Sequence, residues 1–459
     1  MKALISIFFA PFFYLSLCAQ KSNNITQLDH WFQDSLITNS TNVRYNDCYG
    51  FVWKDQEYAV AGSTEGTHVF LIDTSNQFIP VGFIKGRYSN AQVSHRDYAV
   101  FKHYLYAVCD EGLSSLQIID FQDLPNSITL IKEDSIQFGR VHNIFIDTVQ
   151  ETLYSCIHRS VTNTQTIESA MKLFSLNDPL NLSELWAGPS DIQEVHDCYV
   201  RNGKAILNCG YEGMRVYDFS NPQTPVFLDS KTIYQDQGYN HQGWLTPSGN
   251  TYYFADETNG KRIKKCTFDG SEITIKQLFG VNHQNGSVPH NIMATDSFVY
   301  VAYYNEGLRI FDARYPIPTE IAYFDSYSEE SFFKQNGNWG LYTLLPSQRM
   351  LISDRQNGLF LLGFDAALFS EKLIGDAGFI YPNPAKKGET IVLRLPLGAN
   401  NSTLSLYNLL GELLMTYSFD ASDYTAFVPN CAAGSYVVTI DYTDKKQQVQ
   451  HFTSKLIIE

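Results

Sequence analysis

Short apolar runs separated by polar turns follow one another along most of the chain. Typical runs are 105–108 (Leu-Tyr-Ala-Val) and 298–303 (Phe-Val-Tyr-Val-Ala-Tyr), which are rich in β-branched and aromatic residues and are bounded by Gly, Asn and Asp. Such runs predict β-strands joined by tight turns. No helical period persists over a useful window, so we predict an all-β protein.

A polar pair, usually His followed by Asp, Asn or Gln, recurs among these runs. With one marker residue per pair, successive markers are separated by 45 to 54 residues. The seven markers are Asp47, His95, His142, His196, His241, His290 and Asn338. Repetition at roughly 40 to 50 residues, with four short strands per repeat, is typical of a β-propeller. We therefore predict a seven-bladed β-propeller within residues 20–368.

A second mark accompanies most of the polar pairs. A turn with the sequence Glu-Gly is followed by an apolar strand that ends in Asp, as in 212–218 and 306–312, although the third and fifth repeats depart from this pattern. The last repeat shows only three clear strands before the chain changes character. Segment 25–36 resembles the outer strand of other repeats, so we predict that it completes the last blade and leaves no open sheet edge.

The repeat stops at Phe379. The remaining residues, 379–459, show alternating strand patterns and turn glycines, and residues 369–378 are expected to form a linker. Strands are expected at 390–395, 402–407, 412–419, 436–442 and 447–458. This number of strands predicts a small Ig-like β-sandwich.

The tail resembles the type A C-terminal sorting domain of the type IX secretion system of Bacteroidetes-type bacteria. The similarity rests on Tyr-Pro-Asn-Pro at 381–384, Leu-Tyr-Asn-Leu-Leu-Gly at 406–411, Ala-Gly-Ser-Tyr-Val-Val at 433–438 and Lys-Leu-Ile-Ile at 455–458. It implies export across the outer membrane by the type IX machinery. An ordinary Ig-like binding module is the alternative. The residues that would carry the sorting signal are Pro382, Asn383, Pro384, Gly411, Gly434, Tyr436 and Lys455.

The body resembles the secreted "choice-of-anchor B" proteins, which are related to LVIVD-repeat propellers. The similarity rests on His-Arg-Asp at 95–97, Tyr-Asn-His-Gln-Gly-Trp-Leu at 239–245 and Glu-Gly-Leu-Arg-Ile-Phe-Asp at 306–312, and it extends over nearly all of 28–365. It implies a shared body with a variable anchor at the C terminus. It implies no chemistry.

The N terminus has the pattern of a secretory signal peptide. Lys2 is followed by an apolar run at 3–17 and then by Cys18 and Ala19, so we expect cleavage after Ala19, with lipidation at Cys18 as the alternative. No other stretch is apolar enough to span a membrane. Together with the tail, this segment implies a secreted protein or one held at the outer-membrane surface.

Cysteine positions favour buried thiols over a disulfide framework, although export would permit disulfides. Cys198 and Cys209 could face each other across one hairpin and are the single pair that we consider for a bridge. There is no CxxC motif to support a zinc site.

The charge of the chain excludes one class of partner. The net charge is −15 and no basic cluster is longer than two residues, so we do not expect a nucleic-acid ligand, which would require a basic stripe. Charged residues make up only 18% of the 459 residues and aromatic residues 14%. We expect a monomer with a surface rich in neutral polar groups.

Imidazoles and carboxylates should gather at one mouth of the central channel. The polar pair begins the innermost strand of each blade and the Glu-Gly turn joins the second strand to the third, so antiparallel pairing places both marks at the same face. Either these side chains tie neighbouring strands together, or they bind a ligand or a divalent cation. We also expect several of these imidazoles to titrate near neutrality. The candidate residues are His95, Arg96, Asp97, His142, His196, Asp197, His241, His290, Trp244 and Trp339.

Motifs of common enzymes are absent. The sequence contains no GxSxG, P-loop, HExxH, GxGxxG or EF-hand loop. We therefore predict a secreted or cell-surface module that binds an extracellular glycan or protein. The alternative is a propeller hydrolase or lyase that acts on glycans at the channel mouth.

Overall fold

The chain divides into two compact units, residues 1–364 and 365–459. The computed structural model describes residues 22–161, 165–281, 286–315, 317–327, 335–366, 379–381, 383–388, 390–395, 400–419, 424–427, 429, 431–443 and 447–458. The predicted signal peptide, the predicted linker and Pro382 lie outside these residues. Within them the structure is built of β-strands, and no helix is long and apolar enough to cross a membrane.

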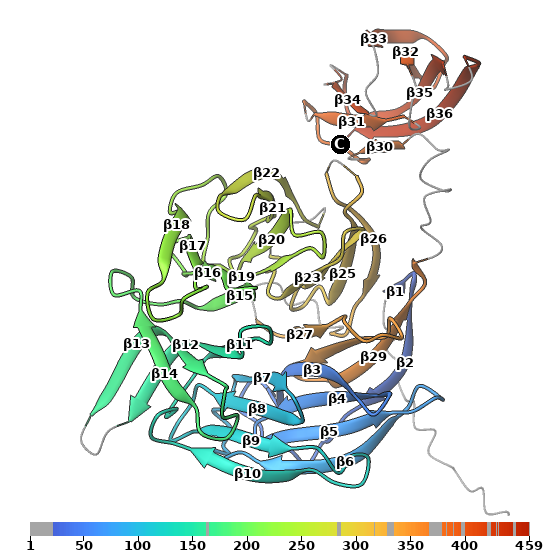
Figure 1. Cartoon of the computed structure of the whole chain (residues 1–459). Coiled ribbons are helices and arrows are strands. Elements are labelled where there is room, and N and C mark those ends of the chain that lie inside the picture. Colours follow the sequence, from blue (N-terminus) through green and yellow to red (C-terminus); the bar gives the residue numbers. More distant parts are fainter. Residues whose placement is uncertain are drawn as a thin grey trace, which may run out of the picture. The chain divides into compact units, whose positions relative to one another are not determined.

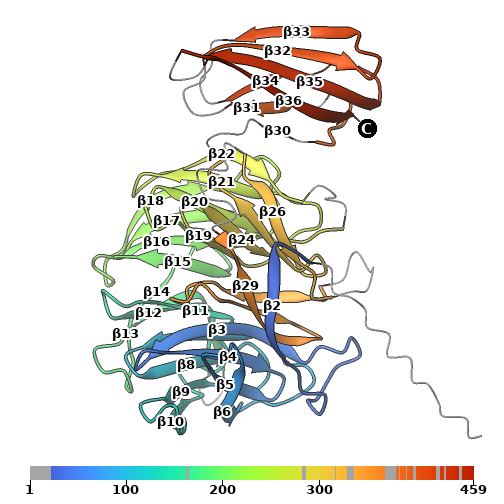
Figure 2. The same ribbon diagram turned by 90° about the vertical axis from the view of Figure 1, so that its right-hand side faces the viewer.

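The described part of the first unit forms seven antiparallel sheets (Figures 1 and 2). Four of them are β3–β6 (Tyr45–Trp53, Gln56–Ser63, Gly66–Ile72, Phe78–Lys85), β7–β10 (Arg96–Phe101, Tyr104–Cys109, Leu116–Asp120, Thr129–Asp134), β11–β14 (Asn143–Asp147, Thr152–Val161, Thr166–Ser175, Ser183–Gly188) and β15–β18 (Asp197–Arg201, Lys204–Asn208, Met214–Asp218, Val226–Lys231). The others are β19–β22 (Asn240–Leu245, Thr251–Asp256, Ile263–Phe268, Ile273–Phe279), β23–β26 (Ile292–Ala294, Phe298–Ala302, Leu308–Asp312, Thr319–Phe324) with β1 (Ser22–Asn23), and β27–β29 (Asn338–Tyr342, Met350–Asp354, Gly358–Phe364) with β2 (Ile25–Trp31).

The sheets form a closed ring. The first strands of neighbouring sheets contact one another in chain order, and β27 contacts β3. Because each sheet packs between two others, its middle strands are buried on both faces, and every residue of β24 is buried. The outer strands are partly exposed, as in β10. Sheets arranged in this way around an axis form a β-propeller.

The last sheet takes its outer strand from the N terminus. Strand β2 pairs antiparallel with β29, and β1 pairs with β26 of the preceding sheet, so the first residues of the unit join two sheets. The strand ends at Trp31, whereas the sequence pattern predicted a strand to residue 36. The Trp31 ring packs against Tyr45, with 5.4 Å between centroids, and against Phe70 at 4.9 Å.

The repeated Glu-Gly turn has a local steric cause. Gly213 and Gly307 have φ angles of 84° and 72°, which favour glycine. A Cβ at Gly213 would lie 2.2 Å from the Lys231 carbonyl oxygen, and one at Gly307 would lie 2.1 Å from that of Phe324. Both carbonyls belong to the outer strand of the same sheet, which approaches the turn too closely for any side chain.

The repeated Asp at the end of the third strand organises the next turn. The Asp218 carboxylate accepts a hydrogen bond from the Ser220 backbone amide at 2.8 Å, and Asp120 accepts one from Gln122 at 2.7 Å. This Asx-turn provides a hydrogen-bond acceptor for a backbone amide that no longer pairs with a neighbouring strand. The second repeated mark, the Glu-Gly turn with its closing Asp, is therefore turn chemistry.

The second unit contains two antiparallel sheets with a shared core. One sheet contains β30 (Phe379–Tyr381), β31 (Ile391–Arg394) and β34 (Tyr424–Phe427), and the other contains β33 (Leu413–Phe419), β32 (Asn400–Asn408), β35 (Gly434–Thr443) and β36 (Val449–Ile458). Leu393 of the first sheet and Leu404 and Ile440 of the second are fully buried in one cluster. Strands β30 and β34 are additional to the five expected.

Candidate functional site

Five histidines and one tryptophan form a closed ring of side chains in the channel. The centroids of neighbouring aromatic rings are 4.2 to 5.0 Å apart. The members, in order around the ring, are His95, His142, His196, His241, His290 and Trp339. The space beside them is about 30 Å³, enough for one or two water molecules. The fold brings these residues together in the channel, where the sequence analysis placed them. The ring is packed too tightly to admit an organic ligand.

Three of the imidazoles are buried as neutral groups. Nδ1 of His196 donates to the His241 carbonyl oxygen at 3.2 Å, and Nδ1 of His290 donates to that of Trp339 at 2.9 Å, which links each sheet to the next. Burial lowers the pKa of His241 to about 4 and holds the pKa values of His196 and His290 well below the usual range. The expectation that they titrate near neutrality is therefore wrong for these three, because water does not reach them.

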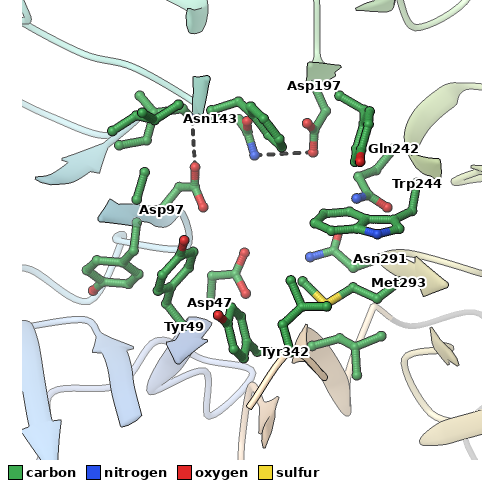
Figure 3. A pocket seen from close by; sticks show the side chains of 18 of the residues that line it. Asp47, Tyr49, Asp97, Asn143, Asp197, Gln242, Trp244, Asn291, Met293 and Tyr342 are labelled. Carbon is green, nitrogen blue, oxygen red and sulfur yellow. Dashed lines mark hydrogen bonds between the residues drawn. The ribbon is translucent and has the colours of Figure 1, made fainter. Parts of the chain in front are cut away.

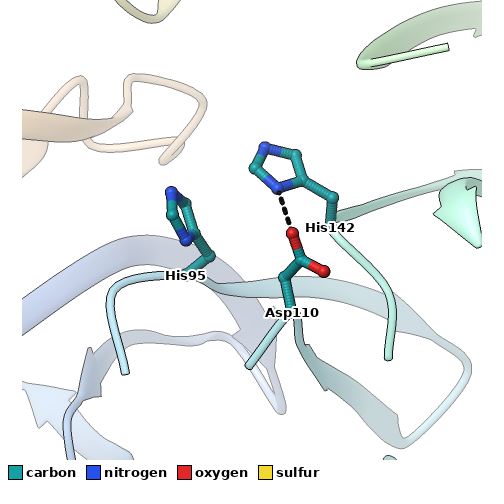
Figure 4. Close-up of side chains that lie close together, drawn as sticks. All are labelled: His95, Asp110 and His142. Atoms are coloured by element: carbon teal, nitrogen blue, oxygen red, sulfur yellow. Dashed lines mark hydrogen bonds and ion pairs between the residues drawn. The ribbon is translucent and has the colours of Figure 1, made fainter. Parts of the chain in front are cut away.

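The opposite side of the ring is more polar (Figure 4). His142 Nδ1 lies 3.0 Å from Asp110 Oδ2, and Arg159 binds the other oxygen of Asp110 at 2.5 Å. Burial opposes protonation of His142, but the hydrogen bond and charge of Asp110 outweigh it and raise the pKa of the imidazole. His95 Nδ1 forms a short hydrogen bond with Glu111.

One group in the described part of the chain has the ligand spacing of a metal site. The ligand atoms of His95, Asp110 and His142 all lie within 4.8 Å of one another. Two imidazoles and a carboxylate suit Zn²⁺. However, the guanidinium of Arg159 already neutralises Asp110, so a cation there would have to compete with a salt bridge.

A second layer of polar side chains lies next to the ring. In each of six sheets, one residue comes from the beginning of the inner strand or from the position just before it, and the seventh sheet supplies Gly340, where a Cβ would lie 2.2 Å from Asp47 Oδ1. In four sheets the ring histidine directly precedes the layer residue, as at His241 and Gln242, so consecutive residues line the ring and this layer. The layer consists of Asp47, Asp97, Asn143, Asp197, Gln242 and Asn291.

Backbone amides hold the three carboxyl groups of this layer in place. Asp97 Oδ2 accepts from the Ile144 amide at 2.6 Å, Asp47 Oδ1 from Cys48 at 2.7 Å, and Asp197 Oδ1 from Cys198 at 2.5 Å. Burial raises the pKa of Asp97 to about 7. Burial and the neighbouring charge of Asp97 raise the pKa values of Asp47 and Asp197 well above the usual range.

These shifts predict a specific pH dependence of stability. Since the folded-state pKa of Asp97 is raised, its contribution to the free energy of unfolding is present at low pH and is lost as the pH rises from about 4 to about 7. We expect Asp97→Asn to remove this loss, so that the variant gains about 1 to 3 kcal/mol relative to the parent between pH 5 and pH 8. Urea unfolding at both pH values measures the gain. The exposed Asp123→Asn should show none, and a pH-independent difference for Asp97→Asn would contradict the assignment.

Beyond the polar layer the channel widens into a cavity of about 300 Å³ (Figure 3). Most of its wall is formed by side chains that follow the polar-layer residues by two positions in the sequence. Residues two positions apart on a strand point to the same side. Thr148 and Leu344 line it and are exposed, so the cavity reaches the surface. The large side chains of the wall are Tyr49, Phe145, Tyr199, Trp244, Met293 and Tyr342.

The structure places two of the predicted site residues away from the ring. Trp244 lines the cavity, with its ring 5.0 Å from that of Tyr199, because it follows Gln242 by two positions. The Arg96 guanidinium donates to the carbonyl oxygens of Ser63 at 2.7 Å and Tyr88 at 2.7 Å, so it is occupied by backbone groups. Asp97 and Asp197 lie in the polar layer between ring and cavity.

Sequence reasoning missed the aromatic wall. Tyr49, Tyr199 and Tyr342 are strand residues of ordinary type, and nothing in their local sequence marks them. The available signal was spacing, since a large side chain stands two residues after most of the polar-layer residues, as at Asp47 and Asp197.

The described cysteines, which include Cys198 and Cys209, are free thiols. Cys198 faces Leu207 in the β15–β16 ladder, which leaves Cys209 out of direct register with it. The single bridge considered from the sequence is therefore not formed.

The described sorting residues lie at the start of the second unit, at a turn, and in strands β35 and β36. Asn383 donates to the Lys455 carbonyl oxygen at 2.6 Å and accepts from the Ile457 amide at 2.8 Å, so it holds the start of the domain against β36. The Tyr436 hydroxyl donates to the Ala432 carbonyl oxygen at 2.6 Å. Gly411 and Gly434 have φ angles of 84° and 157°. Pro384 follows Asn383 through a cis peptide bond.

Comparison with known proteins identifies the tail. Residues 379–459 match the family model of the secretion system C-terminal sorting domain. This confirms the sorting domain predicted from the sequence, and the protein is therefore secreted cargo. No curated protein sequence matches the chain. The relationship of the body to the LVIVD-repeat proteins stays a prediction.

Solved structures that align with the chain include two proteins. The β-propeller domain of Cps50 (Swd1) from Myceliophteria thermophila aligns with a TM-score of 0.49 and 10% identity, over 74% of this chain and 99% of that domain. PorZ of Porphyromonas gingivalis, described as an essential bacterial surface component of the type IX secretion system, aligns with a TM-score of 0.44 and 12% identity. That alignment covers 93% of this chain, which spans 61% of PorZ.

Proposed function

We propose that this protein is an exported seven-bladed β-propeller that binds a ligand in its aromatic-walled cavity. Each of the seven sheets is one blade, and the protein acts as a monomer. The tail, an Ig-like sandwich, engages the type IX secretion machinery after an N-terminal signal peptide has directed the chain across the inner membrane. The body is then presented at the cell surface or released.

The cavity is the observation that carries the binding function. A volume of about 300 Å³ is at the lower end of the range for small-molecule sites, whereas the space at the histidine ring is about a tenth of it. The wall is aromatic and the floor is polar, which is the usual composition of such sites. An extracellular glycan or a side chain of a protein ligand could enter from the exposed end.

Catalysis on glycans is the alternative function. Glycoside hydrolysis needs one protonated and one ionised carboxyl group. Asp97, with a pKa raised to about 7 by burial, could serve as the ionised group beside Asp47 or Asp197, whose pKa values are raised well above the usual range by burial and by the charge of Asp97. The site would then lie on the cavity floor and not at the ring of histidines, where the sequence placed it.

A thermal-shift screen of the full-length secreted chain tests the binding function. The library should contain oligosaccharides, small amines, carboxylates and divalent cations. We expect some of these ligands to raise the melting temperature of the parent but not of Trp244→Ala. The control is Phe227→Ala, which removes an exposed aromatic ring and should respond as the parent does.

Other outcomes of this screen separate the competing sites. A Zn²⁺ shift that is lost in His142→Ala would place binding at the His95, Asp110 and His142 group. Release of sugars from a bound oligosaccharide, lost in Asp97→Asn, would establish the enzyme. Ligands that raise the melting temperature of Trp244→Ala as much as that of the parent would contradict binding in the cavity.

A further inference from the structure

Three carboxyl groups lie between the histidine ring and the cavity. Asp47, Asp97 and Asp197 line it, and no Lys, Arg or His is among its lining residues. None of the three forms an ion pair within the described part of the chain. The other polar groups on the floor are the neutral amides of Asn143, Gln242 and Asn291.

Several other buried carboxyl groups of this chain are paired with basic side chains. Asp256 and Lys264 are both fully buried and lie 2.6 Å apart. Glu57 binds Arg349 at 2.7 Å. Buried charges are normally compensated in this way, because an isolated buried charge is strongly unfavourable. The carboxyl cluster on the cavity floor departs from this practice.

The wall of the cavity suits an organic cation. The rings of Tyr49 and Tyr342 are 4.9 Å apart, and those of Phe145 and Tyr199 are 5.5 Å apart, so aromatic surfaces line several sides of the space (Figure 3). Aromatic faces attract ammonium groups through their quadrupole. Met293 adds a polarisable apolar contact.

We propose that the cavity selects a ligand that carries an alkyl or aryl ammonium group, with the ammonium on the carboxyl floor and the apolar body against the aromatic wall. This inference rests on the proposed binding function and names its ligand class. A bare divalent cation fits the cavity less well, because one oxygen of each carboxylate is already held by a backbone amide and the wall offers few oxygen ligands.

A charge series of matched probes tests the proposal. The probes are 2-phenylethylamine, 2-phenylethanol and phenylacetate, which share a phenyl body and differ in charge. Calorimetric titration of the full-length chain at pH 8 should show the amine bound roughly tenfold more tightly than the alcohol, with phenylacetate weakest. Asp97→Asn with Asp197→Asn should remove the preference for the amine, while Asp123→Asn should keep it.

Variants distinguish loss of selectivity from loss of the site. Asn can still accept the backbone hydrogen bonds of these positions, and the single Asp97→Asn change provides a milder test if the double variant melts early. Trp244→Ala should weaken the amine and the alcohol alike.

Three results would overturn the proposal. The first is equal or tighter binding of the alcohol or phenylacetate. The second is binding of Ca²⁺ or Mg²⁺ that is lost in the double variant. The third is failure of all three probes while a screening ligand still binds in a Trp244-dependent manner; in that case the binding function stands. If no ligand of any class depends on Trp244, both the proposed function and this inference fail.

Discussion

Deletion of residues 22–31 should lower the melting temperature of the protein by about 5 to 10 °C. These residues form β1 and β2, which complete two sheets. Without them β29 becomes an unpaired edge, and its amides and carbonyls lose their partners. Phe360 also loses the stacked His30 ring, whose centroid lies 4.1 Å away. Differential scanning calorimetry measures the change, and light scattering should report aggregation of the open sheet.

A peptide added in trans separates closure from a general effect of truncation. A synthetic peptide of residues 22–36 should restore most of the lost melting temperature, because it can pair with β29 in the same register. A scrambled peptide is the control. A deletion variant as stable as the parent would show that the ring does not depend on its N-terminal strand.

Removal of residues 379–459 should stop export at the periplasm. In a host with a type IX secretion system, we expect the truncated protein in the periplasmic fraction and none at the surface or in the medium. The body should nevertheless fold, since the two units have separate cores. Cell fractionation with immunoblotting measures the location, and calorimetry measures the folding of the retained protein.

A matched pair of substitutions tests whether export needs the folded tail. Val438 is fully buried, whereas Val449 is 77% exposed. Val438→Asp places a charge in the core of the second unit and should block export. Val449→Asp should leave export unchanged. Surface display of the truncated protein would refute the sorting role of the tail.

Part of the repeat pattern followed from local chemistry, which is why it was visible in the sequence. The Glu-Gly turn recurs because the outer strand passes too close for a side chain, as at Gly213. The Asp at the end of the third strand recurs because its carboxylate caps the next turn, as at Asp218. Both causes act within one sheet and leave a mark in most repeats, although the third and fifth repeats depart from the pattern.

The short strands of the tail were harder to predict. Strands β30 and β34 are three and four residues long. The pairing of both with β31 is a long-range property that no local pattern reveals. The remaining strands of the same domain, which include the four-residue β31, were predicted from their alternation.

The sequence by itself determined that the polar pairs approach the channel, and only the tertiary structure decided how their residues divide along it. His241 and Gln242 are neighbours in the chain, yet one belongs to the packed ring and the other to the polar floor of the cavity. Trp244 belongs to a cavity whose wall comes from strands about 50 residues apart. Burial, which holds His241 neutral and Asp97 protonated to higher pH, exists only when the ring of sheets has closed.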